Sequence, residues 1–381
     1  MKRVAQAPAA FADGAGKFSD PSFSDAVIYW QKQYGRHALP WQNTRDAYRI
    51  WLSEIMLQQT QVVAVIPYYQ RFLARFPDIA SLAAASSEEV MAYWSGLGYY
   101  TRARNLHRCA QRIVAEFDGV FPNDPALLIG LPGIGRSTAA AIAAFAYGTR
   151  AAILDGNVKR VFCRVFGIEG FPGAKPIEEN LWQRAVDLLP QQDVEAYIQG
   201  LMDLGATVCT RSRPACSTCP LARRCVALAS ERVHLLPTRK PKKPIPEKIT
   251  AMLVIVDRDH VLLEQRPDSG IWGGLLSLPE VDGPAGEEPE DQRRFEEAAS
   301  RAAAPFGTLV SCDRLQPFSH TFTHFKLHVS PYHVKLASRL QMVAQGSHVW
   351  YPVGRLTDAP LPAPIKKLLR AIFSKDDLLS A

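Results

Sequence analysis

The sequence predicts two folded domains of different class, a mainly α domain over residues 22–230 and an α+β domain over residues 249–372. In the first region apolar residues recur at helical spacing, whereas in the second they alternate as in half-buried strands. Residues 231–248 separate the two and carry four prolines among lysines and arginines, which is typical of a stiff, charged linker. Residues 1–21 are expected to be a disordered leader, and residues 373–381 a tail.

Each domain is expected to contain elements that local sequence signals delimit. Ser22 or Ser24 is expected to cap the first helix, because a serine hydroxyl can accept from the free N–H groups of a first turn. The helices expected in the first domain are 23–34, a run that begins near 46 and includes 51–60, then 73–76, 86–95, 102–117 and 139–147. The strands expected in the second domain are 249–256 and 261–265, joined by a turn at 257–260, with a further strand region at 315–333.

Composition and charge indicate a globular protein that binds nucleic acid. The 381 residues are 47% hydrophobic and 21% charged, which is typical of a globular protein. No apolar run approaches the ~18 residues that suggest a membrane span, and the N-terminus shows no apolar signal core. Up to residue 248 the chain has 30 Lys and Arg against 21 Asp and Glu, a net charge of +9, whereas the remainder has 14 against 16. The basic part therefore favours nucleic acid over a membrane surface as partner.

A glycine-rich turn before a helix is the first candidate site. In Leu-Pro-Gly-Ile-Gly-Arg-Ser-Thr, which ends at Thr138, Gly133 and Gly135 allow a sharp turn and close approach of another molecule. The helix start that follows offers free N–H groups to an anion, and Arg136 and Ser137 add a charge and a hydroxyl. By itself the pattern is more often an ordinary tight connection than a binding site.

Four cysteines indicate a metal site. Cys209, Cys216, Cys219 and Cys225 lie within 17 residues, and without an export signal a disulfide framework is disfavoured. Structural zinc usually takes two short pairs of ligands, but this segment has one pair flanked by single cysteines. Thiolates suit zinc and iron–sulfur clusters alike, so the residues alone leave the metal open.

The order of these motifs resembles the endonuclease-III-like helix-hairpin-helix DNA glycosylases, and among them the members that remove adenine mispaired with 8-oxoguanine. The resemblance covers about residues 23–370. It implies a helix-hairpin-helix domain with a 4Fe–4S cluster on the four cysteines. The C-terminal part resembles a Nudix fold, but the metal-binding box of Nudix hydrolases is not recognisable at 293–298. That domain is therefore expected to recognise 8-oxoguanine, not to hydrolyse a nucleotide.

The resemblance also implies a catalytic set of Glu54, Asp155 and Asn157. Glu54 matches the family's general acid, which donates a proton to N7 of adenine. Asp155 matches the carboxylate that stabilises the sugar cation, electrostatically or through a transient covalent bond, and Asn157 orients it. From the residues alone, Glu54 shares a helical face with Gln58 and Gln61 and reads as part of a solvated polar stripe, whereas Asp155 reads as an ordinary helix cap.

Further roles carry over to matching positions. Trp41 is expected to line the adenine pocket, and Phe322, Thr323 and His324 to contact 8-oxoguanine, with Thr323 in place of the family's serine. The residues expected to contact DNA are Gln58, Gln59, Tyr99, Gly133, Gly135, Arg136, Ser137, Thr138 and Lys159. Ser137 stands where the bifunctional members have a nucleophilic lysine, which predicts a monofunctional glycosylase, although Lys159 lies near enough to Asp155 to give a weak lyase signal.

The expected partner is double-stranded DNA with an A:8-oxoguanine or A:G mismatch, bound by a monomer in the cytoplasm of a bacterium, at the nucleoid, with no membrane contact. Two alternatives remain open. One is a bifunctional endonuclease-III-like glycosylase and lyase. The other is a non-catalytic iron–sulfur DNA-binding protein.

Overall fold

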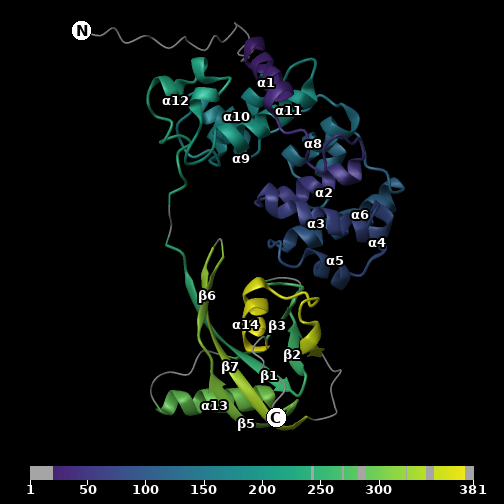
Figure 1. Cartoon of the computed structure of the whole chain (residues 1–381), viewed down its shortest axis with the longest axis vertical. Coiled ribbons are helices and arrows are strands. Elements are labelled where there is room, and N and C mark those ends of the chain that lie inside the picture. The colour runs from purple at the N-terminus through teal and green to yellow at the C-terminus, as the bar shows by residue number, and fades with distance from the viewer. Residues whose placement is uncertain are drawn as a thin grey trace, which may run out of the picture. The chain divides into compact units, whose positions relative to one another are not determined.

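A computed structural model of the chain describes residues 20–241, 244–267, 270–281, 289–322, 324–339 and 347–373. The chain forms two compact units, Met1–Ala84 with Asn105–Lys242, and Ala85–Arg104 with Lys243–Ala381. The first is built of helices, and the second combines helices with a β-sheet (Figure 1). The helical first unit and the mixed second unit confirm the two domain classes that the sequence predicts. In the described ranges no helix is long and apolar enough to cross a membrane.

The first unit contains most of the helices. In chain order they are α1 (Pro21–Tyr34), α2 (Ala47–Leu57), α3 (Val62–Arg75), α4 (Ile79–Ala84), most of α6 (Thr101–Phe117), α7 (Pro125–Ile129), α8 (Arg136–Tyr147), α9 (Gly156–Val165), α10 (Lys175–Asp187), α11 (Val194–Asp203) and α12 (Val226–Ala229). A π-helical turn, η1 (Leu204–Val208), follows α11 directly, and 3-10 turns span Cys216–Thr218 and Ala222–Arg224.

Two of the expected helix signals were wrong. The cap of α1 is Asp20, whose Oδ1 accepts from the Phe23 N–H at 3.2 Å, and neither serine takes this role. The short helix expected at 73–76 is the end of the longer α3. Pro67 lies inside α3 and weakens its local helical signal. The helix forms because its apolar face is buried, at Val65 and Phe72 among others.

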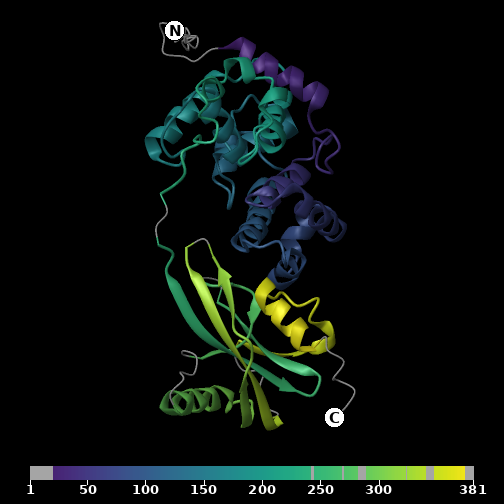
Figure 2. The same cartoon turned by 60° about the vertical axis from the view of Figure 1, so that its left-hand side comes forward.

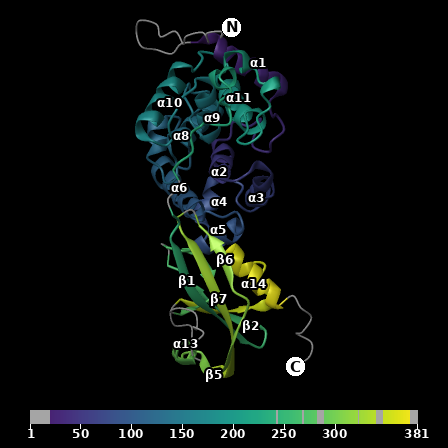
Figure 3. The same cartoon turned by 90° about the vertical axis from the view of Figure 1, so that its left-hand side faces the viewer.

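The core of the first unit lies where α1, α8, α9, α10 and α11 meet. Small residues let these helices approach closely: α8 buries a run of alanines, and a Cβ on Gly200 of α11 would lie 2.8 Å from Cγ1 of Val27 on α1. Figure 3 shows α8, α9 and α11 gathered together. This packing brings the end of α11 beside the start of α9, which positions the site described below.

The second unit is a mixed sheet with covering helices. It contains α5 (Ser87–Trp94), β1 (Glu247–Asp257), β2 (His260–Gln265), β3 (Leu276–Ser277), β4 (Glu280–Val281), α13 (Pro289–Ala303), β5 (Gly307–Arg314), β6 (Phe318–Thr321), β7 (Lys326–Arg339), β8 (His348–Pro352), a 3-10 turn at Val353–Arg355, and α14 (Ala363–Phe373). The sheet order is β3-β2-β1-β7-β5, with β1 and β7 parallel, while β4, β6 and β8 pair with β1, β7 and β2.

The expected strands at 249–256 and 261–265 correspond to β1 and β2, and the turn between them is closed by the Asp257–His260 pair. Successive residues of β1 face opposite sides of the sheet. Leu253 and Ile255 pack with Phe295 of α13, whereas Met252 and Val254 are buried on the other face. The two sides are therefore both covered, and Figure 2 shows α13 and α14 on either side of the sheet.

Candidate active site

A cavity of the first unit has a volume of about 660 Å³. Its wall is made by the turn between α1 and α2, one face of α2, the start of α8, the segment before α9, and α11. Of the residues expected to be functional, it brings together Trp41, Glu54, Gln58, Ser137, Thr138, Asp155 and Asn157. Concave sites of this size are typical of small-molecule binding.

Glu54 projects from α2 into this cavity. Asp46 caps the helix by accepting from the Tyr48 N–H at 2.9 Å, and the neighbours of Glu54 in the helix, Ser53 and Ile55, are buried. Burial, and to a smaller extent the nearby Asp155 carboxylate, raises the pKa of Glu54 to about 7. A carboxyl in such surroundings keeps its proton near neutral pH, so Glu54 is not part of a solvated stripe.

Asp155 faces the same cavity in a more polar setting. As the cap of α9 its Oδ1 accepts from the Val158 N–H at 2.8 Å, and its Oδ2 accepts from Nδ2 of Asn157 at 3.1 Å. Burial raises the pKa of the Asp155 carboxyl, but these hydrogen bonds and the charge of Arg160 oppose the rise. By contrast, no donor in the described ranges is bonded to the Glu54 carboxyl. Hydrogen-bond donors therefore favour the ionised form of Asp155, whereas burial favours the protonated form of Glu54, as an ionised partner and an acid require.

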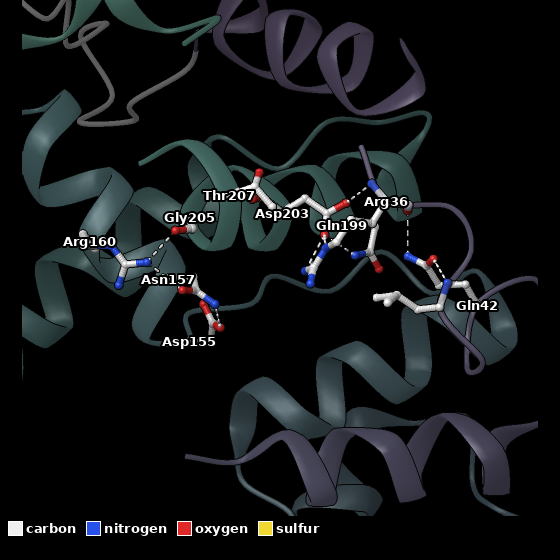
Figure 4. Close-up of polar contacts among 10 residues, drawn as sticks. Arg36, Gln42, Asp155, Asn157, Arg160, Gln199, Asp203, Gly205 and Thr207 are labelled. Carbon is white, nitrogen blue, oxygen red and sulfur yellow. Dashed lines mark hydrogen bonds and ion pairs between the residues drawn. The ribbon is translucent and has the colours of Figure 1, made fainter. Parts of the chain in front are cut away.

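Arg160 ties Asn157 to the segment that carries the first cysteine. Its Nη2 donates to Oδ1 of Asn157 at 2.7 Å and to the Gly205 carbonyl at 2.6 Å, and its Nε donates to the Cys209 carbonyl at 2.7 Å. Figure 4 shows Asn157 between Asp155 and Arg160. With Oδ1 held by a guanidinium, the Asn157 amide must present its NH₂ to Asp155.

The glycine turn has the conformation that its sequence predicts. Gly133 adopts φ +78°, and a Cβ there would lie 2.9 Å from Cβ of Asn105. Gly135 caps α8 without a side-chain partner, which leaves the helix start open on that side. Arg136 lies over the Trp182 ring, 3.8 Å from its centre, an arrangement that sequence reasoning missed because α10 supplies the ring.

Ser137 and Thr138 point inward. Oγ of Ser137 accepts from the Leu154 N–H at 2.8 Å, and the buried Thr138 hydroxyl lies 3.5 Å from Nε2 of Gln58. The hydrogen bond between Ser137 and Leu154 joins the first turn of α8 to the segment that ends in Asp155. Both residues thus line the cavity and brace its wall.

Trp41, expected at the adenine, lines the same cavity, whereas Gln59, Tyr99 and Lys159, expected at the DNA, do not. Trp41 lines the cavity with its ring edge-on to Tyr69, at 5.4 Å between centroids. Gln59 is exposed at φ +57° and lies outside the cavity lining. Tyr99 belongs to the second unit, is 50% exposed at φ +51°, and lies under Arg102. Lys159 is paired with Glu178 at 2.5 Å.

The four cysteines line one small apolar cavity between α9 and the loop that follows η1. Buried Arg164 organises this loop, because its guanidinium donates to the carbonyls of Leu236 at 2.8 Å and Thr210 at 2.7 Å and reaches Sγ of Cys209 at 3.4 Å. No group of three or more His, Cys, Asp or Glu side chains in the described ranges has the spacing to hold a metal ion. A cavity shared by four thiols, with the Arg164 guanidinium directed at the sulfur of Cys209, fits the chemistry of a thiolate-bound cluster.

In the second unit an aromatic cluster surrounds the segment expected to contact 8-oxoguanine. Phe322 stacks on Phe325 at 4.5 Å between ring centroids and lies 5.8 Å from Trp272, while His320 meets Phe322 edge-on. His324 follows at the tip, and Thr323 lies outside the described residues. The cluster presents ring faces, which suit stacking with a base.

Sequence reasoning also missed a polar group at the cavity wall opposite Asp155. Arg36, Gln42 and Gln199 line the cavity, and the buried carboxylate of Asp203 holds Arg36 and Gln199 from behind. Gln199 and Asp203 are four residues apart in the otherwise apolar end of α11. That spacing was the available signal, since a polar pair on a buried helix face needs partners.

Two families of known proteins match parts of this chain. The HhH-GPD superfamily of base excision DNA repair proteins matches residues 52–185, and the NUDIX domain family matches residues 250–371. The chain is 35% identical to the adenine DNA glycosylase of Buchnera aphidicola (subspecies Acyrthosiphon pisum), over 91% of this chain and 96% of that protein. It is 34% identical to the Homo sapiens adenine DNA glycosylase, over 92% of this chain and 73% of that protein.

Among solved structures, the first unit is similar to a thermostable thymine-DNA glycosylase. The TM-score is 0.50 and the sequence identity 27%, over 55% of this chain and 95% of that one.

Proposed function

Because the chain belongs to the adenine DNA glycosylase family, an enzyme family of base excision repair, we propose that it hydrolyses the bond between adenine and deoxyribose at A:8-oxoguanine and A:G mismatches. The observation that supports this most is that one cavity brings together Glu54, whose burial favours the protonated form, and Asp155, whose hydrogen-bond donors favour the ionised form. A base inside a duplex must leave the stack before its glycosidic bond can be reached, and the cavity is large enough for an extruded purine.

Glu54 supplies the proton. Adenine leaves poorly as an anion, so transfer of the Glu54 proton to N7 lets the bond between C1′ and N9 break with its electron pair on the base. With a pKa of about 7, Glu54 holds this proton in a large fraction of molecules at neutral pH. The resulting carboxylate then accepts a proton from the water that adds to C1′, which restores the acid.

Asp155 stabilises the positive charge that develops on the sugar. Its carboxylate is held by Val158 and Asn157, so it need not reorganise when the charge appears. Asn157 is in turn fixed by Arg160, which keeps the amide NH₂ directed at Asp155. The ionised form of Asp155 and the protonated form of Glu54 are required together.

The reaction ends at base release. A lyase needs an amine nucleophile, but the Ser137 hydroxyl at that position accepts a hydrogen bond from Leu154 N–H. Lys159 is engaged by Glu178 and lacks a free amine for the sugar. These contacts support a monofunctional glycosylase over the lyase alternative.

Extrusion of the base is assigned to the DNA-contact residues. The free N–H groups at the start of α8 suit a phosphate, and Arg136 adds charge beside them. Gln59 and Tyr99, both exposed and held at positive φ, are proposed to fill the gap in the stack. In the second unit Phe322, Thr323 and His324 are proposed to contact 8-oxoguanine.

The cysteine cavity is proposed to hold a 4Fe–4S cluster on Cys209, Cys216, Cys219 and Cys225. Such a cluster would crosslink the loop internally, and because Arg160 of α9 donates to the Cys209 carbonyl, it would also steady Asn157. Iron analysis and visible absorbance of the purified protein test this, and a colourless protein that contains zinc would contradict it.

The central test compares duplexes with A:8-oxoguanine and with thymine glycol, with and without alkaline treatment of the product. We expect adenine release from the first, and strand breaks only after alkali. Product from the thymine glycol duplex alone would favour an endonuclease-III-like enzyme. Unchanged adenine release in both Glu54→Gln and Asp155→Asn would contradict the catalytic assignment.

A further inference from the structure

Asp203, the last residue of α11, has a fully buried carboxylate behind the cavity wall. Its Oδ2 accepts from the Arg36 backbone N–H at 2.8 Å. Its Oδ1 accepts from Nε of Arg36 at 2.7 Å and Nη2 at 2.6 Å, and from Nε2 of Gln199 at 2.8 Å. Figure 4 shows Arg36 and Gln199 converging on it. A buried charge persists only when it is paired and bonded in this way.

Arg36 begins the turn that forms one wall of the cavity. The Arg36 carbonyl accepts from Nε2 of Gln42 at 2.9 Å, and Oε1 of Gln42 accepts from the Leu39 N–H at 3.0 Å. This closes the turn around Leu39 and Trp41, and all four side chains line the cavity. The position of this wall thus depends on where Asp203 holds Arg36.

The residues after Asp203 hold the opposite wall. The π-helical turn η1 begins at the next residue, and Oγ1 of Thr207 donates to the Asp203 carbonyl at 2.8 Å. Within η1, Gly205 lies so close to Asn157 that a Cβ would be 2.5 Å from Cβ of Asn157. The Gly205 carbonyl also accepts from Arg160. The short segment from Asp203 to Thr207 therefore contacts two walls of the cavity: the turn that carries Trp41, through Arg36, and the start of α9 with Asp155, through Asn157.

We propose that Asp203 is a positioning residue for base release: it sets the distance between the turn that carries Trp41, which lines the base, and Asp155. The inference rests on the proposed function, because the proposed function places the extruded adenine in this cavity. Rates of bond cleavage fall steeply when reacting groups are misplaced by about 1 Å, even by changes remote from the chemistry. Asparagine at this position would keep the shape but turn an NH₂ toward the donors of Arg36 or Gln199.

The test compares Asp203→Asn with Asp193→Asn. Asp193 begins α11, lies outside the cavity lining, and pairs with Lys32 of α1 at 2.8 Å, so the control also removes an ion pair between α11 and α1. Single-turnover adenine release gives the rate of cleavage. The Kd for a duplex with 2′-fluorodeoxyadenosine opposite 8-oxoguanine gives binding without cleavage, since the fluorine disfavours the sugar cation.

We expect Asp203→Asn to lower the single-turnover rate by about tenfold or more while the Kd changes less than about threefold. Asp193→Asn should alter neither by more than about twofold. Adding Arg36→Gln to Asp203→Asn should lower the rate no further, because both changes remove the same ion pair between Arg36 and Asp203. Equal rates in Asp203→Asn and Asp193→Asn, a Kd that rises as much as the rate falls, or losses that multiply in the double variant would overturn the inference.

Arg36→Lys covers the case in which Asp203→Asn does not fold. Lysine keeps the charge but cannot reach Asp203 with the paired donors of arginine. A wild-type rate in that variant overturns the inference, and the same selective loss of rate supports it. Absence of adenine release from the wild-type protein would refute the proposed function itself. Release by the wild type with an unaffected Asp203→Asn refutes the inference alone.

Discussion

Changing Glu54 to Gln should stop adenine release and, above pH 7, stabilise the folded chain. Burial raises the pKa of Glu54 from its usual 4.5 to about 7. The unfolded chain loses this proton near pH 4.5 and the folded chain only near pH 7. The free energy of unfolding therefore falls as the pH rises between these values, and the loss is complete above pH 7.

The size of the effect follows from the same pKa. Ionised Glu54 destabilises the fold by at most about 3 kcal/mol, less where water enters the open cavity. Glutamine keeps the shape without the charge, so Glu54→Gln should be more stable than the wild type by about 1–3 kcal/mol at pH 8 and by little at pH 5. Loss of the general acid should lower the single-turnover rate by about 10²–10⁴-fold.

Urea unfolding at pH 5 and pH 8, followed by far-UV circular dichroism, measures the stability difference. Glu179→Gln removes an exposed carboxyl of α10 and serves as control. In the wild type the rate should fall about tenfold per pH unit above pH 7 as the acid loses its proton. An equal stability gain at both pH values, or a wild-type rate in Glu54→Gln, would refute the argument that burial keeps this carboxyl protonated.

Three further predictions follow from single contacts. Gly205→Ala places a Cβ 2.5 Å from the facing side chain of α9, so we expect a stability loss of about 1–3 kcal/mol and slower base release, whereas Gly156→Ala, which has open space, should cause neither. Trp182→Leu removes the ring beneath Arg136 and should weaken duplex binding about three- to tenfold at fixed salt with little change in single-turnover rate, as titrations by fluorescence anisotropy will show. Phe322→Ala should reduce the preference for 8-oxoguanine over guanine opposite adenine, measured as the ratio of release rates, and an unchanged ratio would exclude this ring from lesion recognition.

Much of the fold was accessible from local pattern. The change from helical to alternating periodicity predicted the helical unit and the sheet, and the turn at 257–260 was confirmed. Asp155 was readable as a cap because a cap involves only residues within one helical turn. Errors arose where packing outweighed local signals: α3 continues through Pro67 because its apolar face is buried.

The candidate site shows the same division. The motifs identified Glu54, Asp155 and the glycine turn. The structure places Glu54, Asp155 and the start of the helix after that turn, Ser137 and Thr138, around one cavity. Local reasoning assigned Glu54 to a solvated stripe, because α2 alone does not show what covers its face. The sequence predicted that Lys159 contacts DNA, and it could not show that Glu178 of α10 forms an ion pair with this lysine.

By itself, then, the sequence determined the order of motifs, the domain classes, the basic N-terminal part and the positions where chemistry could occur. Only the tertiary structure decided what buries Glu54, which donors reach Asp155 and what holds the cavity walls apart. The reason is physical: propensities and caps act over one helical turn, whereas desolvation and ion pairing depend on every neighbour in space. Arg36 and Asp203, 167 positions apart in the chain, meet only because α1 and α11 pack together.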